Sequence, residues 1–203
     1  MISVERLKEL AAMRDQGSDT SYIPEVSDFS EVKTVFPATR APASLTRHMC
    51  RMADIRPDMR VLEPSAGAGG MVDVIREFTP RIIAVEINAV LHKELQSRNC
   101  ERTYRRDFLR IEPYSRNLSA RHIPAELPQF DAVIMCPPAN SDAHVAHAQR
   151  FLRPGGVLVA LVQEQNIDRV LWPTYEPVDA KFRMGSTDIP CGIIRLEYDR
   201  GWV

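Results

Sequence analysis

Residues 61–70 of this 203-residue chain read VLEPSAGAGG, and this stretch decides the fold. An apolar run ends in an acid, Glu63, and a glycine-rich turn follows before a helical pattern begins at Gly70. Glycine permits close backbone approaches that other residues exclude, and the first N–H groups of a helix have no partner within it. A strand, a tight turn and a helix in this order are typical of the ligand-binding edge of an open parallel sheet.

Similar apolar runs recur downstream, each bounded by turn residues. They are short and nearly continuous, which favours strands buried on both faces of a parallel sheet. The runs are Arg60–Glu63, Ile82–Glu86, Ala132–Cys136 and Val157–Val162. Helical patterns separate them, at Gly70–Phe78, Ala89–Asn99 and Ala143–Phe151. Strands that alternate with helices predict a doubly wound α/β domain.

The segments around this pattern predict the rest of the domain. Residues 1–30 are expected to form a short helix and a polar linker, and residues 31–203 the α/β domain. A helix is expected over Ala43–Ile55, with Ser44 as its cap. The tail predicts an antiparallel strand pair, Ala180–Arg183 with Ile193–Tyr198.

One long stretch, Glu112–Gln129, breaks the rhythm with three prolines and predicts a loop. Partly overlapping it, the segment from Arg98 to Arg121 holds seven arginines against three acids. Such a run forms either a solvated face or a patch that faces phosphates.

The composition sets limits on the class of protein. With 44% hydrophobic and 26% charged residues, the chain resembles an ordinary globular domain. No apolar window approaches the roughly 18 residues of a membrane span, and the net charge of −1 excludes a generally basic protein. The four cysteines do not have the spacing of a metal site. His144 and His147 are three residues apart but have no third ligand at a recognisable spacing, so no metal site is predicted. Scattered thiols indicate the cytoplasm.

A second acid stands at a fitting distance from the glycines. Glu86 ends the second predicted strand about 20 residues later, where a carboxylate can accept hydrogen bonds from both hydroxyls of a ribose. This pairing would also fit a dinucleotide-dependent oxidoreductase. The glycine turn after Glu63 lacks the third glycine of the dinucleotide fingerprint, which disfavours an oxidoreductase.

At these residues the sequence resembles the class I S-adenosylmethionine-dependent methyltransferases, over about residues 36–198. The resemblance implies a Rossmann-like, mostly parallel seven-stranded sheet with a terminal antiparallel pair, and S-adenosylmethionine as cofactor. It implies that the first motif, Glu63 to Gly69, holds the methionine part of the cofactor. It also implies that Glu86 binds the ribose and that the adenine contacts the third motif, Asp107-Phe108. The cofactor-binding residues implied are Phe36, Thr39, Glu63, Ser65, Ala66, Gly67, Gly69, Glu86, Ile87, Asp107 and Phe108.

The sequence is most similar to the branch that methylates amino groups of nucleic acids. There the fourth strand ends in Asn or Asp, followed by Pro-Pro and an aromatic residue. This chain reads Cys136-Pro137-Pro138-Ala139-Asn140 at that place. The resemblance implies catalytic roles for Cys136, Pro137, Pro138 and Asn140, in which oxygen acceptors hold the amine and aim it at the methyl group.

The expected function is therefore methyl transfer to an amino nitrogen of DNA or RNA, with nucleic acid as partner and neither membrane nor metal involved. A further interpretation makes Cys136 a nucleophile. The order of residues disfavours it, because the nucleophilic cysteine of the enzymes that use one follows a proline, whereas Cys136 precedes one. Two rival functions stay open: a methyltransferase of a small molecule or protein, and a cofactor-binding protein that has lost catalysis and acts as a binding or antagonist protein. The sequence makes no prediction of the oligomeric state.

Overall fold

The computed structural model describes residues 41–113, 126–138, 141–163, 174–184 and 187–198. The predicted N-terminal helix and linker lie outside the described residues, as do the candidate site residues Phe36, Thr39 and Asn140.

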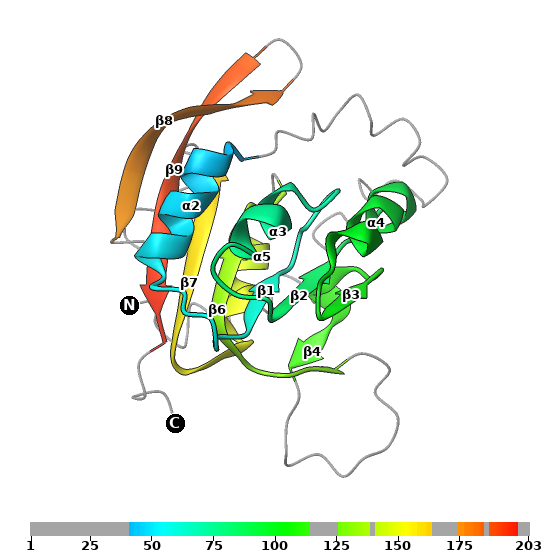
Figure 1. Cartoon of the computed structure of the whole chain (residues 1–203). Coiled ribbons are helices and arrows are strands. Elements are labelled where there is room, and N and C mark those ends of the chain that lie inside the picture. The colour runs from blue at the N-terminus through cyan, green and yellow to red at the C-terminus, as the bar shows by residue number, and fades with distance from the viewer. Residues whose placement is uncertain (1–40, 114–125, 139–140, 164–173, 185–186, 199–203) are drawn as a thin grey trace, which may run out of the picture.

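A seven-stranded sheet with the order β3-β2-β1-β6-β7-β9-β8 forms the centre of the protein (Figure 1). The first five strands in this order are parallel, whereas β9 runs antiparallel to both β7 and β8. The strands are β1 (Val61–Glu63), β2 (Ile82–Val85), β3 (Arg102–Tyr104), β6 (Phe130–Met135), β7 (Leu152–Gln163), β8 (Tyr175–Met184) and β9 (Thr187–Glu197). The predicted doubly wound α/β fold with a terminal antiparallel pair is confirmed.

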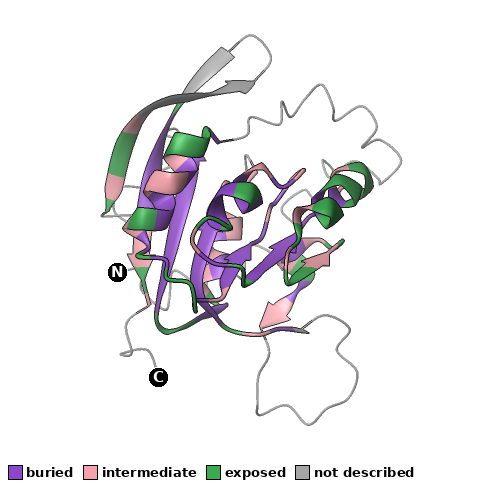
Figure 2. Cartoon of the chain, viewed as in Figure 1, coloured by how far each residue is buried: buried purple, intermediate pink, exposed green. Residues whose placement is uncertain are grey.

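Helices cover both faces of this sheet because successive strand residues point to opposite sides. Val61 belongs to the core cluster beneath α2, α3 and α4, and its neighbour Leu62 to the cluster beneath α5. The central strands are accordingly buried throughout (Figure 2). The helices are α2 (Ala43–Met52), α3 (Gly70–Ile75), α4 (Ala89–Leu95) and α5 (Ser141–Gln149), with short 3-10 turns η3 (Gln96–Arg98) and η4 (Phe108–Arg110).

Some sequence predictions differ from the structure. Ser44 does not cap α2: the cap position is Pro42, and no side chain makes a capping hydrogen bond. The predicted loop Glu112–Gln129 begins and ends in two short strands, β4 (Glu112–Pro113) and β5 (Glu126–Leu127), which pair in parallel.

The terminal hairpin is also longer than predicted, and the predicted pairing is wrong: residues 181–183 pair with residues 188–190 and not with residues 193–198. Pairing between β7 and β9 reaches Gln163 and Cys191, while β8 and β9 remain paired as far as Met184 and Thr187. The tip of the hairpin therefore extends past the edge at which the parallel strands end (Figure 1).

Candidate active site

The glycine turn lies at the carboxyl ends of β1 and β2. Ala66 N–H donates to the Val85 carbonyl at 2.9 Å, which ties the turn to the second strand. Gly67 and Gly69 have φ angles of +55° and +89°, in the left-handed region that favours glycine. A Cβ at Gly67 would meet nothing within 4 Å, so the turn leaves open space there.

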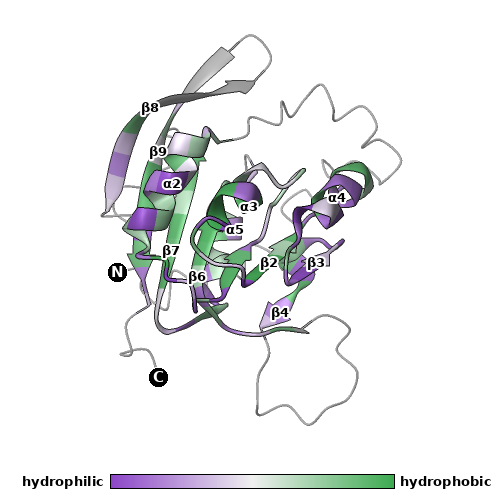
Figure 3. Ribbon diagram, in the orientation of Figure 1, coloured by the Kyte–Doolittle hydropathy of each residue, from purple (hydrophilic) through white to green (hydrophobic). Residues whose placement is uncertain are grey.

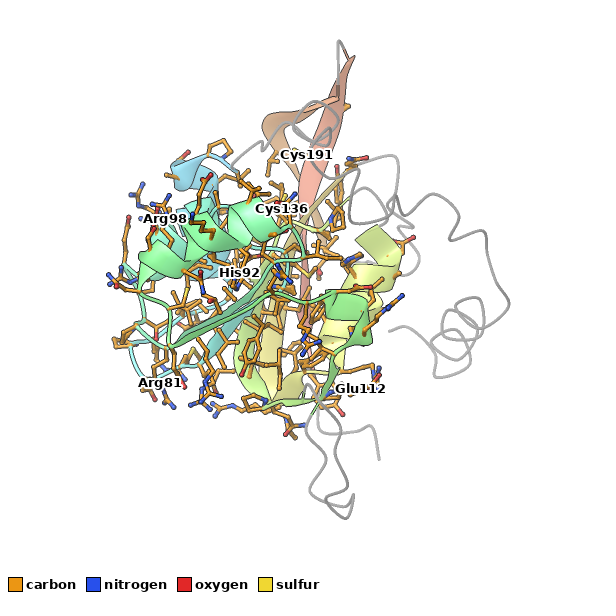
Figure 4. All side chains as sticks on the ribbon, turned by 90° about the vertical axis from the view of Figure 1, so that its right-hand side faces the viewer. Arg81, His92, Arg98, Glu112, Cys136 and Cys191 are labelled. Atoms are coloured by element: carbon orange, nitrogen blue, oxygen red, sulfur yellow. The ribbon has the colours of Figure 1, made fainter. Side chains whose placement is uncertain are left out.

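Arg98, at the end of η3, closes the other side of the turn. Its Nε–H donates to the Ala68 carbonyl at 3.1 Å, and its Nη1 pairs with Asp73 of α3 at 2.9 Å (Figure 4). A Cβ at Gly69 would lie 2.6 Å from Cγ of Arg98, so Gly69 is required by packing as well as by conformation. Sequence reasoning missed this contact, which depends on the placement of α4 rather than on any motif.

Glu63 is buried at the tip of β1, with 1% of its surface exposed. Its Oε1 accepts a hydrogen bond from Ser65 N–H at 3.1 Å, whereas Oε2 and the Ser65 hydroxyl have no partner among the described residues. Burial raises the pKa of Glu63 well above its usual value; the Ser65 N–H opposes this rise, and the charge of Glu86 adds to it. Buried polar groups normally have partners, so these two atoms indicate a polar ligand at the turn.

Glu86 follows β2 and faces the glycine turn. One carboxylate oxygen accepts from Gly67 N–H at 2.8 Å and the other from Asn88 N–H at 2.7 Å. Burial raises the pKa of Glu86, and the N–H groups of Asn88, Gly67 and Ile87 oppose the rise. Because each carboxylate oxygen has two acceptor positions, Glu86 keeps acceptor capacity for a ligand.

An exposed apolar pair continues from Glu86. Ile87 and Val90 are 44% and 52% exposed, and no other large hydrophobic residue with described burial is classed as exposed. Asn88, which lies between them, holds the start of α4 in place. Its Oδ1 caps the helix by accepting from Val90 N–H at 2.9 Å and from Leu91 N–H at 3.1 Å. The structure thus presents an apolar surface beside a carboxylate, which suits a planar ring attached to a sugar. Only Ile87 of this pair was predicted.

Asp107 and Phe108 follow the third strand along the same edge. Asp107 Oδ1 accepts from Leu109 N–H at 3.0 Å and caps η4, and its other oxygen lies 3.4 Å from Nε of Arg110. The Phe108 ring is buried, with centroids 5.2 Å from Phe151 and 4.9 Å from His147. Phe108 therefore anchors the segment that carries Asp107.

His147 of α5 also supports this segment, a role that the sequence did not predict. Its Nε2 lies 2.8 Å from the Ile111 carbonyl, which can only accept, so Nε2 carries the proton. Its Nδ1 then accepts from Arg150 at 3.3 Å. The signal in the sequence is the three-residue spacing of His144 and His147, which places both on one side of α5. Among the described residues no group of three potential metal ligands occurs.

Cys136 follows β6, next to Pro137 and Pro138 and close to Glu63. Burial raises the pKa of its thiol to about 12, and the charges of Glu63 and Cys191 add to this rise. At neutral pH the thiol is therefore protonated, whereas a cysteine nucleophile reacts as the thiolate. Figure 4 shows Cys136 within the body of the protein.

Comparison with solved structures identifies the fold. TrmN from Thermus thermophilus matches 75% of this chain with a TM-score of 0.50 and 22% identity. A Pyrococcus horikoshii protein proposed to be an RNA methyltransferase matches all of it, with a TM-score of 0.60 and 14% identity, over its whole length. The chain has a methyltransferase fold.

A third structure of this fold contains a ligand. An RNA methyltransferase from Salinibacter ruber in complex with S-adenosyl-L-homocysteine matches 80% of this chain over 95% of its own length, with a TM-score of 0.51 and 13% identity.

The present chain spans only 48% of the Thermus thermophilus protein. No protein-family model and no curated protein matches the sequence significantly. Within the described residues, no helix is long and apolar enough to cross a membrane.

Proposed function

We propose that this protein is an S-adenosylmethionine-dependent methyltransferase that acts on an amino nitrogen of RNA or DNA. The observation that carries the proposal is the set of groups at the tips of β1 and β2. Three groups lie around one glycine turn: a buried carboxyl with one oxygen unpartnered among the described residues, a second carboxylate with spare acceptor capacity, and an exposed isoleucine. Together, these acceptor groups and the apolar side chain suit a nucleoside that also bears polar amino-acid groups.

Each part of the proposed cofactor has residues suited to it. Glu86 accepts from the ribose hydroxyls, Ile87 covers one face of the adenine, and Asp107 accepts from the adenine amino group. Glu63 Oε2 and the Ser65 hydroxyl, both buried without a partner among the described residues, face the methionine part. The open space at Gly67 admits it. When bound, the cofactor supplies an electrophilic methyl group on a sulfonium, a good leaving group.

The acceptor end lies at Cys136, Pro137 and Pro138, with Asn140 beyond the described residues. Two successive prolines stiffen the turn because each fixes its φ angle, and its backbone carbonyls accept from the amine of the substrate. Asn140 supplies a side-chain acceptor that Cys136 lacks. Alignment of the amine is then the main catalytic contribution of the protein. The neighbours named RNA methyltransferases favour a nucleic-acid substrate.

A second candidate is a protein that binds the cofactor without transferring the methyl group. Cys136 favours it, because a protonated thiol replaces the oxygen acceptor that aligns the amine in the branch this sequence resembles. The cofactor site would be the same in both cases.

Incubation with methyl-labelled S-adenosylmethionine and separate pools of duplex DNA, single-stranded DNA, RNA and protein distinguishes the candidates. Label in a nucleic-acid pool supports the proposal, and label in the protein pool alone contradicts the proposed substrate. Binding of S-adenosylhomocysteine without label in any pool favours the second candidate. If neither binding nor label is seen, both are wrong.

A further inference from the structure

The arginines of the basic stretch fall into distinct groups in the structure. Arg98 is engaged at the glycine turn and Arg110 with Asp107, while Arg116 and Arg121 lie outside the described residues. The other three, Arg102, Arg105 and Arg106, form what we call the β3 patch.

The β3 patch lies on the outermost parallel strand and in the turn that follows it. All three arginines are exposed, and none forms an ion pair with a described residue. Among the residues that the structure describes, Arg102 donates only to the Tyr104 hydroxyl, at 3.3 Å. Of the two acids nearby, Glu101 is paired with Arg60 at 2.8 Å, and Asp107 with Arg110.

Ion pairs with described residues therefore do not neutralise the patch, although the hydrogen bond to the Tyr104 hydroxyl and, more weakly, the charge of Glu101 raise the pKa of Arg102. In Figure 3, β3 is hydrophilic beside the hydrophobic β2. His92 of α4 is affected by it: burial lowers the pKa of His92, and the charge of Arg105 lowers it further. The rest of the molecule compensates for the patch, since the whole chain has a net charge of −1.

The place and chemistry of the patch suit a chain of phosphates. Arg102 begins β3, and Arg105 and Arg106 follow its last residue, Tyr104, so the three arginines lie along one strand edge and just beyond its end. Guanidinium groups bind phosphate oxygens bidentately. The patch also ends one residue before Asp107, at the edge that carries the candidate cofactor site.

We infer that the β3 patch binds the phosphate backbone of a polynucleotide and holds it along the sheet edge next to the candidate active site. This inference rests on the proposed function and specifies where its substrate is held. A different explanation is that the arginines only prevent edge-to-edge pairing of β3, as charges on edge strands do. An acidic protein would be a different partner for the same charges. Binding measurements separate the three.

The test uses a triple variant of the full chain, Arg102→Gln, Arg105→Gln and Arg106→Gln. The matched control removes three exposed arginines elsewhere, as Arg51→Gln, Arg56→Gln and Arg81→Gln. The probes are a labelled 20-nucleotide single-stranded RNA and a 20-base-pair DNA duplex, titrated from 50 to 300 mM KCl.

Loss of three phosphate contacts makes the slope of log K against log salt concentration shallower by about 2 for single strands and about 3 for duplex. At 0.1 M salt this corresponds to about 100- to 500-fold weaker binding. The inference requires this change in the patch variant on at least one probe, and a change of less than threefold in the control. Equal slopes in wild type and patch variant overturn the inference. Poly-glutamate is tested as a model of an acidic protein partner, and the inference also fails if the substitutions weaken binding to poly-glutamate but not to either polynucleotide.

The same variants are titrated with S-adenosylhomocysteine. Unchanged affinity in the patch variant, together with weakened polynucleotide binding, supports the inference even where no transfer is seen. If the wild type binds S-adenosylhomocysteine and transfers methyl groups but the patch variant keeps its polynucleotide affinity, the inference fails while the proposed function stands. Aggregation of the patch variant with unchanged polynucleotide affinity identifies edge protection instead.

Discussion

Three alanine substitutions distinguish the effect of the glycine turn on stability from its effect on ligand binding. Two are in the turn, at Gly67 and Gly69, and the third, at Gly155 of β7, is a control. All three glycines have positive φ, at +55°, +89° and +77° respectively. An L-residue in the left-handed region costs about 1–2 kcal/mol, so each substitution carries a similar conformational cost. Only at Gly69 would the new Cβ clash, 2.6 Å from Cγ of Arg98; nothing lies within 4 Å at the other two positions.

Gly69→Ala must therefore move Arg98 as well. That loses the hydrogen bond to the Ala68 carbonyl, about 0.5–1.5 kcal/mol, and the half-exposed pair with Asp73, about 0.2–1 kcal/mol. We expect Gly69→Ala to lower the free energy of unfolding by about 2–4 kcal/mol, and Gly67→Ala and Gly155→Ala by about 1–2 kcal/mol each. At about 2–4 °C per kcal/mol for a chain of this size, the difference is visible in Tm.

Binding should follow another order. Gly67→Ala places a methyl group in the proposed cofactor space and should weaken binding of S-adenosylhomocysteine at least tenfold, while Gly155→Ala leaves it unchanged. Urea unfolding and isothermal titration calorimetry measure the two quantities. Equal stabilities of the Gly69 and Gly155 variants would refute the packing argument, and normal binding by Gly67→Ala would refute the placement of the ligand.

Three further predictions concern single side chains. The raised pKa of Glu63 means that, as pH rises above about 4.3, the carboxyl ionises first in the unfolded chain while the native one stays protonated. Stability therefore falls by up to about 1.4 kcal/mol per pH unit until the native pKa is reached. Glu86, whose pKa is also raised, contributes a slope of the same sign, so Glu63→Gln should make the fall measured by urea unfolding at pH 4 to 8 shallower without abolishing it, and an unchanged slope would contradict the prediction. Cys136→Ala should keep methyl transfer within about threefold because alignment rather than thiolate attack drives transfer, and loss of turnover in a folded variant would restore the nucleophile hypothesis. Phe108→Ala should destabilise the protein by about 3–5 kcal/mol and weaken S-adenosylhomocysteine binding; a loss below 1 kcal/mol would show that the ring does not anchor the Asp107 segment.

The fold could be predicted because its central strands are buried on both faces. Such strands show as nearly continuous apolar runs: Ile82–Glu86 and Ala132–Cys136 were predicted, and the strands are Ile82–Val85 and Phe130–Met135. The edge strand Arg102–Tyr104 was not assigned from residue patterns, since it is short and only partly buried and has no apolar run. The hairpin was predicted too short because its outer part pairs with only one partner strand and needs no apolar pattern.

The residues of the candidate site that directly follow a strand could be predicted from the sequence. The residues that are placed by packing between distant segments could not. Glu63 and Glu86 end apolar runs, so topology alone brings them together. His147 and Arg98 act through contacts with segments 30 or more residues away, at Ile111 and Ala68, which no local pattern encodes. Likewise the high pKa of the Cys136 thiol arises from its three-dimensional surroundings.

A crystal structure of the full chain with S-adenosylhomocysteine tests the central claim most directly. The account predicts ribose hydroxyls within hydrogen-bond distance of the Glu86 carboxylate, adenine against Ile87, and a polar partner for Oε2 of Glu63. A nucleoside bound elsewhere, with Glu86 bonded only to the N–H groups of Gly67 and Asn88, would contradict it.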